Sequence, residues 1–216
     1  MSAYPAPTVL PHGSDDPAAP LVVLLHGRGS NEQDVIALAD LLPAGPAYAA
    51  VRAPIGEGGG YAWFANRGIG RPAAESLADT IAWFRAWLDP IAPPGRPVVL
   101  AGFSGGATFA GGLVLDDPAR FAGLAILYAG LPFDAGVPTT AGRLAGFPVF
   151  AVQGDADTVI PPDLQRRAWQ YLHGESGAQL TSRRSPGGHA ITRADVDALA
   201  DWISERAAAR PFRSRT

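Results

Sequence analysis

Short apolar runs alternate with segments of helical periodicity along most of this 216-residue chain, and no other feature constrains its fold as strongly. The first run, Leu21–Leu25, reads LVVLL and has no polar face. Such runs are typical of strands covered on both sides, as in parallel sheets. Strands are expected at residues 21–25, 47–52, 98–103, 124–128, 149–152 and 179–183, and helices at residues 32–42, 73–89, 105–115, 163–172 and 193–209. The alternation predicts an α/β fold with βαβ units and a mostly parallel central sheet, with helices on both faces.

The expected elements follow one another without a sequence repeat or a linker. A length of 216 residues favours one domain, so residues 1–216 are interpreted as a single domain. Residues 1–19 are rich in proline and are expected to form an extended lead-in, with at most a short edge strand near residues 8–10. The basic tail at residues 210–216 is expected to be frayed.

Local signals predict the ends of several elements. Ser30 and Asn31 are expected to cap the first helix, and Ser30 has the spacing of a capping box with Gln33. Residues 54–72 are expected to form a long glycine-rich loop. The prolines within residues 90–97 are expected to break the second helix.

Composition excludes several functional classes. The chain has no cysteine, so a disulfide framework, a cysteine-ligated metal site and a cysteine nucleophile are excluded. It has no lysine, and its net charge of −3 argues against a nucleic-acid partner. Residues 97–115 carry no charge but contain five glycines, so a buried strand and helix are expected there and not a membrane span. No targeting segment is visible, and a cytoplasmic monomer or homodimer without cofactor or metal is expected.

The strongest chemical signal is Gly102-Phe103-Ser104-Gly105-Gly106, which has the pattern G-x-S-x-G. It follows an expected strand and opens an expected helix. In that context the pattern is typical of a strained turn that lifts a serine Oγ above the carboxyl edge of a sheet. The alternative is a glycine-rich packing turn whose serine caps the helix.

A serine hydroxyl needs a base to act as a nucleophile, and the chain has four histidines. His12 lies in the lead-in, His26 directly follows a strand, and His173 ends a helix, where its charge complements the helix dipole. His189 lies in a loop between the last strand and the last helix, on the same sheet edge as Ser104. His189 is therefore the preferred base, although a histidine that only orders its loop is the alternative.

The imidazole in turn needs a carboxylate to hold its tautomer. Asp155 and Asp157 both follow the strand at residues 149–152. Asp155 adjoins the turn glycine and can serve local turn bonding, whereas Asp157 lies further into the loop. Asp157 is preferred and Asp155 is kept in reserve, which gives the chain order Ser, Asp, His.

The loop His26-Gly27-Arg28-Gly29 follows the first strong strand. A serine hydrolase of this topology takes one oxyanion N–H from this loop and one from the residue after the nucleophile. The backbone N–H groups of Arg28 and Gly105 are therefore the candidate oxyanion donors. A phosphate-binding loop is the alternative, but its motif requires a lysine that this chain lacks.

These segments together resemble the phospholipase/carboxylesterase family of α/β hydrolases, the acyl-protein-thioesterase-like serine esterases. The matching stretches are LLHGRGSNEQD (24–34), RAP (52–54), GGGYAWF (58–64), AGFSGGA (101–107), QGDADTVIP (153–161) and GGHAIT (187–192). The resemblance implies an α/β-hydrolase fold without a large cap domain. It also implies Ser104 as nucleophile, Asp157 as acid, His189 as base, and Arg28 and Gly105 as oxyanion donors. The family often has glutamine where this chain has Gly105, a change that keeps the backbone donor.

Two loops carry candidate substrate-binding residues. Trp63 and Phe64 lie in the first, Leu131 lies in the second, and both loops leave the carboxyl side of their strands. The alternative is that these side chains fold onto the core. The sequence thus predicts hydrolysis of small carboxylic esters with short to medium acyl chains. A thioesterase or lysophospholipase acting on longer chains, and a non-catalytic binding protein on the same fold, are the alternatives.

Overall fold

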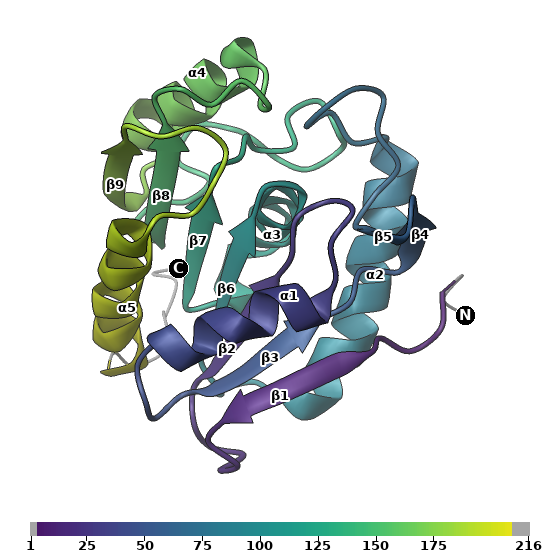
Figure 1. The fold of residues 1–216 in the computed structure, drawn as a ribbon, viewed down its shortest axis with the longest axis vertical. Helices are drawn as coiled ribbons and strands as arrows, with labels where there is room; N and C mark the ends of the chain where they lie inside the picture. Colours follow the sequence, from purple (N-terminus) through teal and green to yellow (C-terminus); the bar gives the residue numbers. More distant parts are fainter. Residues whose placement is uncertain (1–3, 209–216) are drawn as a thin grey trace.

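A seven-stranded sheet forms the centre of the computed structural model, which describes residues 4–208 (Figure 1). The strand order is β1-β3-β2-β6-β7-β8-β9, and only β1 runs antiparallel to its neighbour. The strands are β1 (Val9–Gly13), β2 (Leu21–Leu25), β3 (Ala47–Val51), β6 (Val98–Phe103), β7 (Gly123–Leu127), β8 (Pro148–Gly154) and β9 (Gln179–Ser185). This arrangement confirms the predicted mostly parallel α/β sheet.

Helices cover both faces of the sheet, as predicted (Figure 1). One core layer joins the sheet to α2 and α3 and to part of α4, and the other joins it to α1 and α5. The helices are α1 (Glu32–Ile36), α2 (Ala74–Ile91), α3 (Gly105–Asp116), α4 (Pro162–Gln170) and α5 (Arg193–Ala208). Because α3 lies against the centre of the sheet, its residues from Gly106 to Leu115 are all buried.

Several element ends differ from the sequence-based expectations. The edge strand β1 is longer than expected and pairs with β3 along all five of its residues. Helix α1 ends at Ile36, and residues 37–41 continue as a 3₁₀ helix. Asn31 alone caps α1, because its Oδ1 accepts from the backbone N–H groups of Gln33 and Asp34. Ser30 instead donates its hydroxyl to the Asp34 carboxylate, so no capping box forms.

The expected loop at residues 54–72 contains a hairpin of β4 (Ile55–Glu57) and β5 (Gly60–Ala62), which the sequence did not indicate. Helix α2 includes Pro90 and ends at Ile91, two residues beyond the expected end at residue 89 but within the proline-containing stretch 90–97 that was expected to break it. The Ala92 N–H donates to the Leu88 carbonyl at this end. Residues 209–216, which include the expected frayed tail, lie outside the described residues.

The uncharged stretch at residues 97–115 forms β6 and most of α3, as expected. Within residues 4–208, no helix has both the length and the hydropathy that crossing a membrane requires. The parallel strands β2, β6, β8 and β9 all end at one edge of the sheet, and the register sets Leu25 of β2 beside Gly102 of β6. This edge therefore brings together the loops that carry His26, Ser104, Asp157 and His189.

Candidate active site

Ser104 occupies a strained turn between β6 and α3. Its φ of 51° and ψ of −120° are unusual for a residue with a side chain. The flanking glycines are required by close backbone approach: a Cβ on Gly102 would lie 2.5 Å from the Ala107 nitrogen, and one on Gly106 would lie 2.3 Å from the Leu25 carbonyl oxygen. The Ser104 side chain makes no capping bond to α3, so the helix-cap alternative is wrong.

Three side chains from separate loops form one line of hydrogen bonds. His189 Nε2 lies 2.9 Å from Ser104 Oγ, and His189 Nδ1 lies 2.8 Å from Asp157 Oδ2. Because a carboxylate only accepts, Nδ1 carries the proton and donates to Asp157, which leaves Nε2 to accept from the serine hydroxyl. This arrangement is able to take the proton of Ser104 as its Oγ forms a new bond.

Asp157 is fixed by its own loop. Its side chain is nearly inaccessible, and its Oδ1 accepts from the backbone N–H groups of Val159 and Ile160 at 2.8 and 3.1 Å. The other oxygen is thereby directed to His189. Asp155, the reserve candidate, is exposed and pairs with Arg184 at 2.7 Å, so the structure does not bring it to His189.

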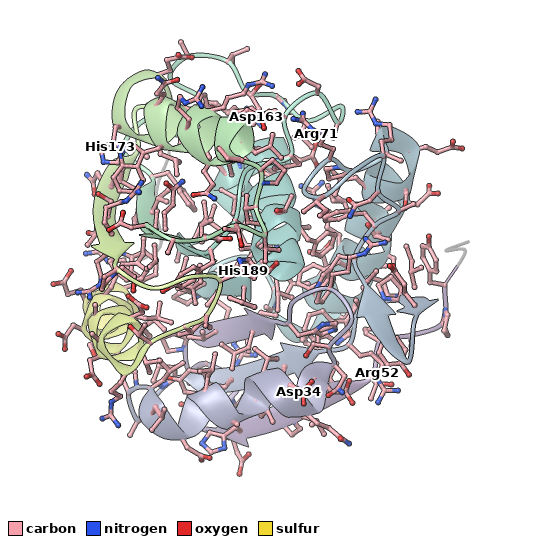
Figure 2. The ribbon with its side chains drawn as sticks, turned by 45° about the horizontal axis from the view of Figure 1, so that its top comes forward. Asp34, Arg52, Arg71, Asp163, His173 and His189 are labelled. Carbon is pink, nitrogen blue, oxygen red and sulfur yellow. The ribbon has the colours of Figure 1, made fainter. Side chains whose placement is uncertain are left out.

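The other three histidines pair with groups other than Ser104. His12 lies 3.7 Å from Asp40, next to the edge strand β1. His173 Nδ1 donates to the Trp169 carbonyl at 2.9 Å and lies at the edge of the molecule, whereas His189 lies near the centre of the view (Figure 2). His26 is buried and belongs to the loop that faces Ser104.

His26 fixes the direction of the Gly27–Arg28 peptide group. Its Nδ1–H donates to the Gly27 carbonyl at 2.7 Å, and its Nε2 accepts from the Ala53 N–H at 3.1 Å. This bonding requires the neutral ring, and burial lowers the pKa of His26, which favours the same form. In a trans peptide the N–H points opposite to the carbonyl, so the Arg28 N–H is directed away from His26.

Gly105 lies opposite Arg28, and a Cβ on Gly105 would be 3.3 Å from the Arg28 nitrogen. Gly105 is the first residue of α3, so its N–H has no acceptor within the helix. Both residues line a cavity of about 610 Å³, which Ser104 and His189 also line. Four of the five predicted chemical residues therefore line one cavity, and the fifth, Asp157, is linked to it through its hydrogen bond to His189.

The predicted substrate-binding residues divide between cavity and core. Trp63 and Phe64 line the cavity, although the Trp63 ring also stacks on Phe109 and its Nε1–H donates to the His26 carbonyl. Leu131 is fully buried and packs beneath α3, where a Cβ on Gly111 would lie 2.7 Å from it. Leu131 does not line the cavity, because its side chain is buried in the core.

Sequence reasoning missed several residues of the cavity wall. Glu57 comes from the unexpected hairpin, Asn66 and Ile69 from the loop that follows it, and Val159 from the loop after Asp157. Ile69 and Val159 are large apolar side chains that remain 57% and 44% exposed. No local pattern marks these residues, although exposed apolar side chains beside a cavity are typical of ligand sites.

A buried polar cluster supports the loop of His189. Asp195, at the start of α5, accepts from the Tyr128 hydroxyl at 2.7 Å and from the Thr192 hydroxyl at 2.6 Å. Burial raises the pKa of Asp195, but the hydrogen bonds from Thr192, Tyr128 and Arg183 outweigh it and hold the pKa below its ordinary value. Burial also raises the pKa of Tyr128 to about 12. The cluster anchors the end of the histidine loop in the core.

No group of three or more potential metal-ligating histidine or acidic side chains occurs in the part of the chain that the structure describes.

Comparison with known proteins shows which family the chain belongs to. A model of the Phospholipase/Carboxylesterase family matches residues 12–206. The structure resembles the Bacillus cereus carboxylesterase, with a TM-score of 0.79, 23% identity, and coverage of 93% of this chain and 94% of the other. It also resembles a carboxylesterase from Mesorhizobium loti (TM-score 0.75, 27% identity, 86% and 88% covered) and Zea mays acyl-protein thioesterase 2 (0.74, 21%, 93% and 99%). The chain therefore belongs to the phospholipase/carboxylesterase family of hydrolases.

Proposed function

We propose that this protein cleaves small carboxylic esters through an acyl-enzyme intermediate. Ser104 Oγ attacks the ester carbonyl while His189 Nε2 takes its proton, and Asp157 stabilises the resulting imidazolium. His189 then gives that proton to the departing alcohol. Water, deprotonated by His189, cleaves the acyl-enzyme and releases the acid. The observation that carries the proposal is the continuous hydrogen-bonded line of Ser104, His189 and Asp157 at the cavity.

The N–H groups of Arg28 and Gly105 are the proposed donors to the oxyanion that forms in each step. Removing one such donor costs about 2.7–4 kcal/mol of barrier in other serine hydrolases. Short to medium acyl chains are the proposed substrates, because loops wall the cavity and no large helical cap covers it in the described residues. Comparing butyryl with palmitoyl esters and thioesters separates this proposal from a long-chain thioesterase or lysophospholipase.

Ser104→Ala tests the proposal directly. We expect hydrolysis of 4-nitrophenyl butyrate to fall at least about 10³-fold, because Ser104 is the hydroxyl that His189 Nε2 contacts in the described part of the chain. A fluorophosphonate probe is expected to label the wild type at Ser104 and to leave the variant unlabelled. Ser30→Ala is the matched control, since Ser30 also lines the cavity but donates to Asp34. Wild-type hydrolysis by Ser104→Ala would overturn the proposal, and absence of labelling would revive the non-catalytic alternative.

A further inference from the structure

The lining of the cavity contains one arginine and one acidic side chain. Among the described residues that line it, Arg28 is the only arginine and Glu57 the only carboxylate. Arg28 comes from the loop after β2, and Glu57 comes from β4 of the hairpin. Their side chains are 33% and 43% exposed, so they face the solvent-filled space and are not part of the core.

Nearly every N–H donor of the Arg28 guanidinium has a hydrogen-bond acceptor. Its Nε–H donates to Glu57 Oε1 at 2.9 Å, and its Nη2 pairs with the other oxygen of the same carboxylate. Its Nη1 donates to the Phe64 carbonyl at 3.0 Å. The Asn66 amide, oriented so that its nitrogen donates to Gly68, presents its oxygen to the same Nη1 at 3.1 Å. Four of the five N–H groups of the guanidinium are therefore engaged.

We propose that Glu57 is a specificity-determining residue that fits the cavity to uncharged esters by neutralising Arg28. The inference rests on the proposed esterase function and names its substrate class. In a two-bond arginine–carboxylate pair the opposite charges largely cancel, so the pair exerts little electrostatic attraction on a third charged group. An ester with an additional carboxylate would have to displace Glu57 to bind Arg28, whereas a neutral ester leaves the pair intact.

The reaction gives a physical reason for this pairing. Every turnover converts a neutral ester into a carboxylate product beside Ser104. An unpaired arginine in the same cavity would attract that anion and slow its release. Glu57 removes this attraction while the Arg28 backbone N–H remains available at the other end of the residue.

A purely structural role for Glu57 makes a different prediction. If the ion pair only holds the hairpin against the loop of Arg28, then losing it lowers the rate for every ester alike. If Glu57 sets the charge of the cavity, then losing it changes the ratio between anionic and neutral substrates. The substrate ratio therefore distinguishes the two roles.

The test uses Glu57→Gln, which keeps the size of the side chain and removes its charge. Each substrate pair has the same shape but a different charge. In one pair the anionic ester is 4-carboxyphenyl butyrate and the neutral ester is 4-carbamoylphenyl butyrate. In the other pair the anionic ester is the phenyl monoester of adipic acid, and the neutral ester is the phenyl ester of adipic acid monoamide. We expect the ratio of kcat/KM for the anionic over the neutral ester to rise about tenfold in at least one pair at low salt. High salt is expected to reduce this increase in the ratio, because ions screen a partly exposed charge.

Two controls complete the design. Asp197→Asn makes the same change in net charge at an exposed ion pair on α5, and it is expected to leave both ratios unchanged. The double variant Arg28→Met, Glu57→Gln is expected to return the ratio to its wild-type value, since no cation remains to be unmasked. Unchanged ratios in folded Glu57→Gln would overturn the inference. If the wild type instead hydrolyses neither neutral ester at a rate that depends on Ser104, the proposed function itself fails.

Discussion

Two loops meet at Ser104, and they are held in different ways. The loop at residues 26–30 is held mainly through its backbone: the Gly29 N–H donates to the Tyr61 carbonyl at 2.9 Å, and the Tyr61 N–H donates to the Ser30 carbonyl at 3.0 Å. The loop at residues 186–192 instead depends on its ends and on side chains. Near the start of this loop, the Gly187 carbonyl accepts from the Ala156 N–H at 3.1 Å. At its end, Thr192 donates to the Asp195 carboxylate.

The difference follows from what each loop supplies in the proposed reaction. The first loop supplies a backbone N–H, whose direction is set by the peptide plane, so the backbone itself has to be fixed. The second loop supplies an imidazole, whose direction is set by the partner at its other nitrogen, so Asp157 fixes the ring. The comparison predicts that the first loop is sensitive to changes in packing and the second to loss of one hydrogen bond.

The largest effect is expected from Asp157→Asn. An amide in place of the carboxylate favours the wrong tautomer of His189, and kcat is expected to fall about 10⁴-fold on 4-nitrophenyl butyrate. Asp155→Asn is the matched control and is expected to stay within about threefold of wild type, because Asp155 forms only an exposed ion pair. A larger loss for Asp155→Asn would show that the carboxylate assignment is wrong.

A smaller but still large effect is expected from Gly60→Ala. A Cβ on Gly60 would lie 1.9 Å from the Gly29 carbonyl oxygen, so the hairpin has to move away from the loop of Arg28. We expect kcat to fall about 10²-fold, as for the loss of one oxyanion donor, with a smaller change in KM. Gly56→Ala lies in the same hairpin and meets no atom within 4 Å, so it is expected to retain activity. Equal rates for the two variants would contradict the proposed sensitivity of the first loop.

The smallest effect concerns pH and His26. Because burial lowers the pKa of His26, the folded protein holds its proton less tightly than the unfolded chain does. The stability due to the neutral ring is therefore complete above the ordinary pKa of about 6.5 and is lost as pH falls below it.

Urea unfolding of wild type and His26→Gln between neutral and acidic pH measures this contribution. The wild type is expected to lose stability faster than the variant below the ordinary histidine pKa, with an added slope of at most about 1.4 kcal/mol per pH unit. The other histidines are common to both proteins and cancel in the difference. If the unfolding free energies of the two proteins depend on pH in the same way, protonation of His26 does not destabilise the folded protein. Neutral His26 would then not be what holds the loop.

Much of the fold was predictable because it depends on local patterns. The apolar run LVVLL is stable only where both of its faces are covered. It forms β2, which lies inside the sheet between β3 and β6 with all five residues buried. The G-x-S-x-G segment was recognisable for a partly similar reason: Gly102 is required by a close contact within the turn itself, with the Ala107 nitrogen, although Gly106 is required by the neighbouring strand β2. The hairpin β4–β5 was missed because its three-residue strands are too short for a periodic pattern.

The sheet, the order of its loops and the kinds of side chain available for chemistry follow from the amino-acid sequence alone, because backbone periodicity and turn geometry are local properties. Three contacts depend instead on the folded arrangement: Asp157 reaches His189, Leu131 packs under α3 and not in the cavity, and Glu57 pairs with Arg28. Each of these contacts joins residues from different loops, or from a loop and a helix or strand that lies elsewhere in the sequence. Their distances depend on how whole elements pack, which no short stretch of sequence encodes.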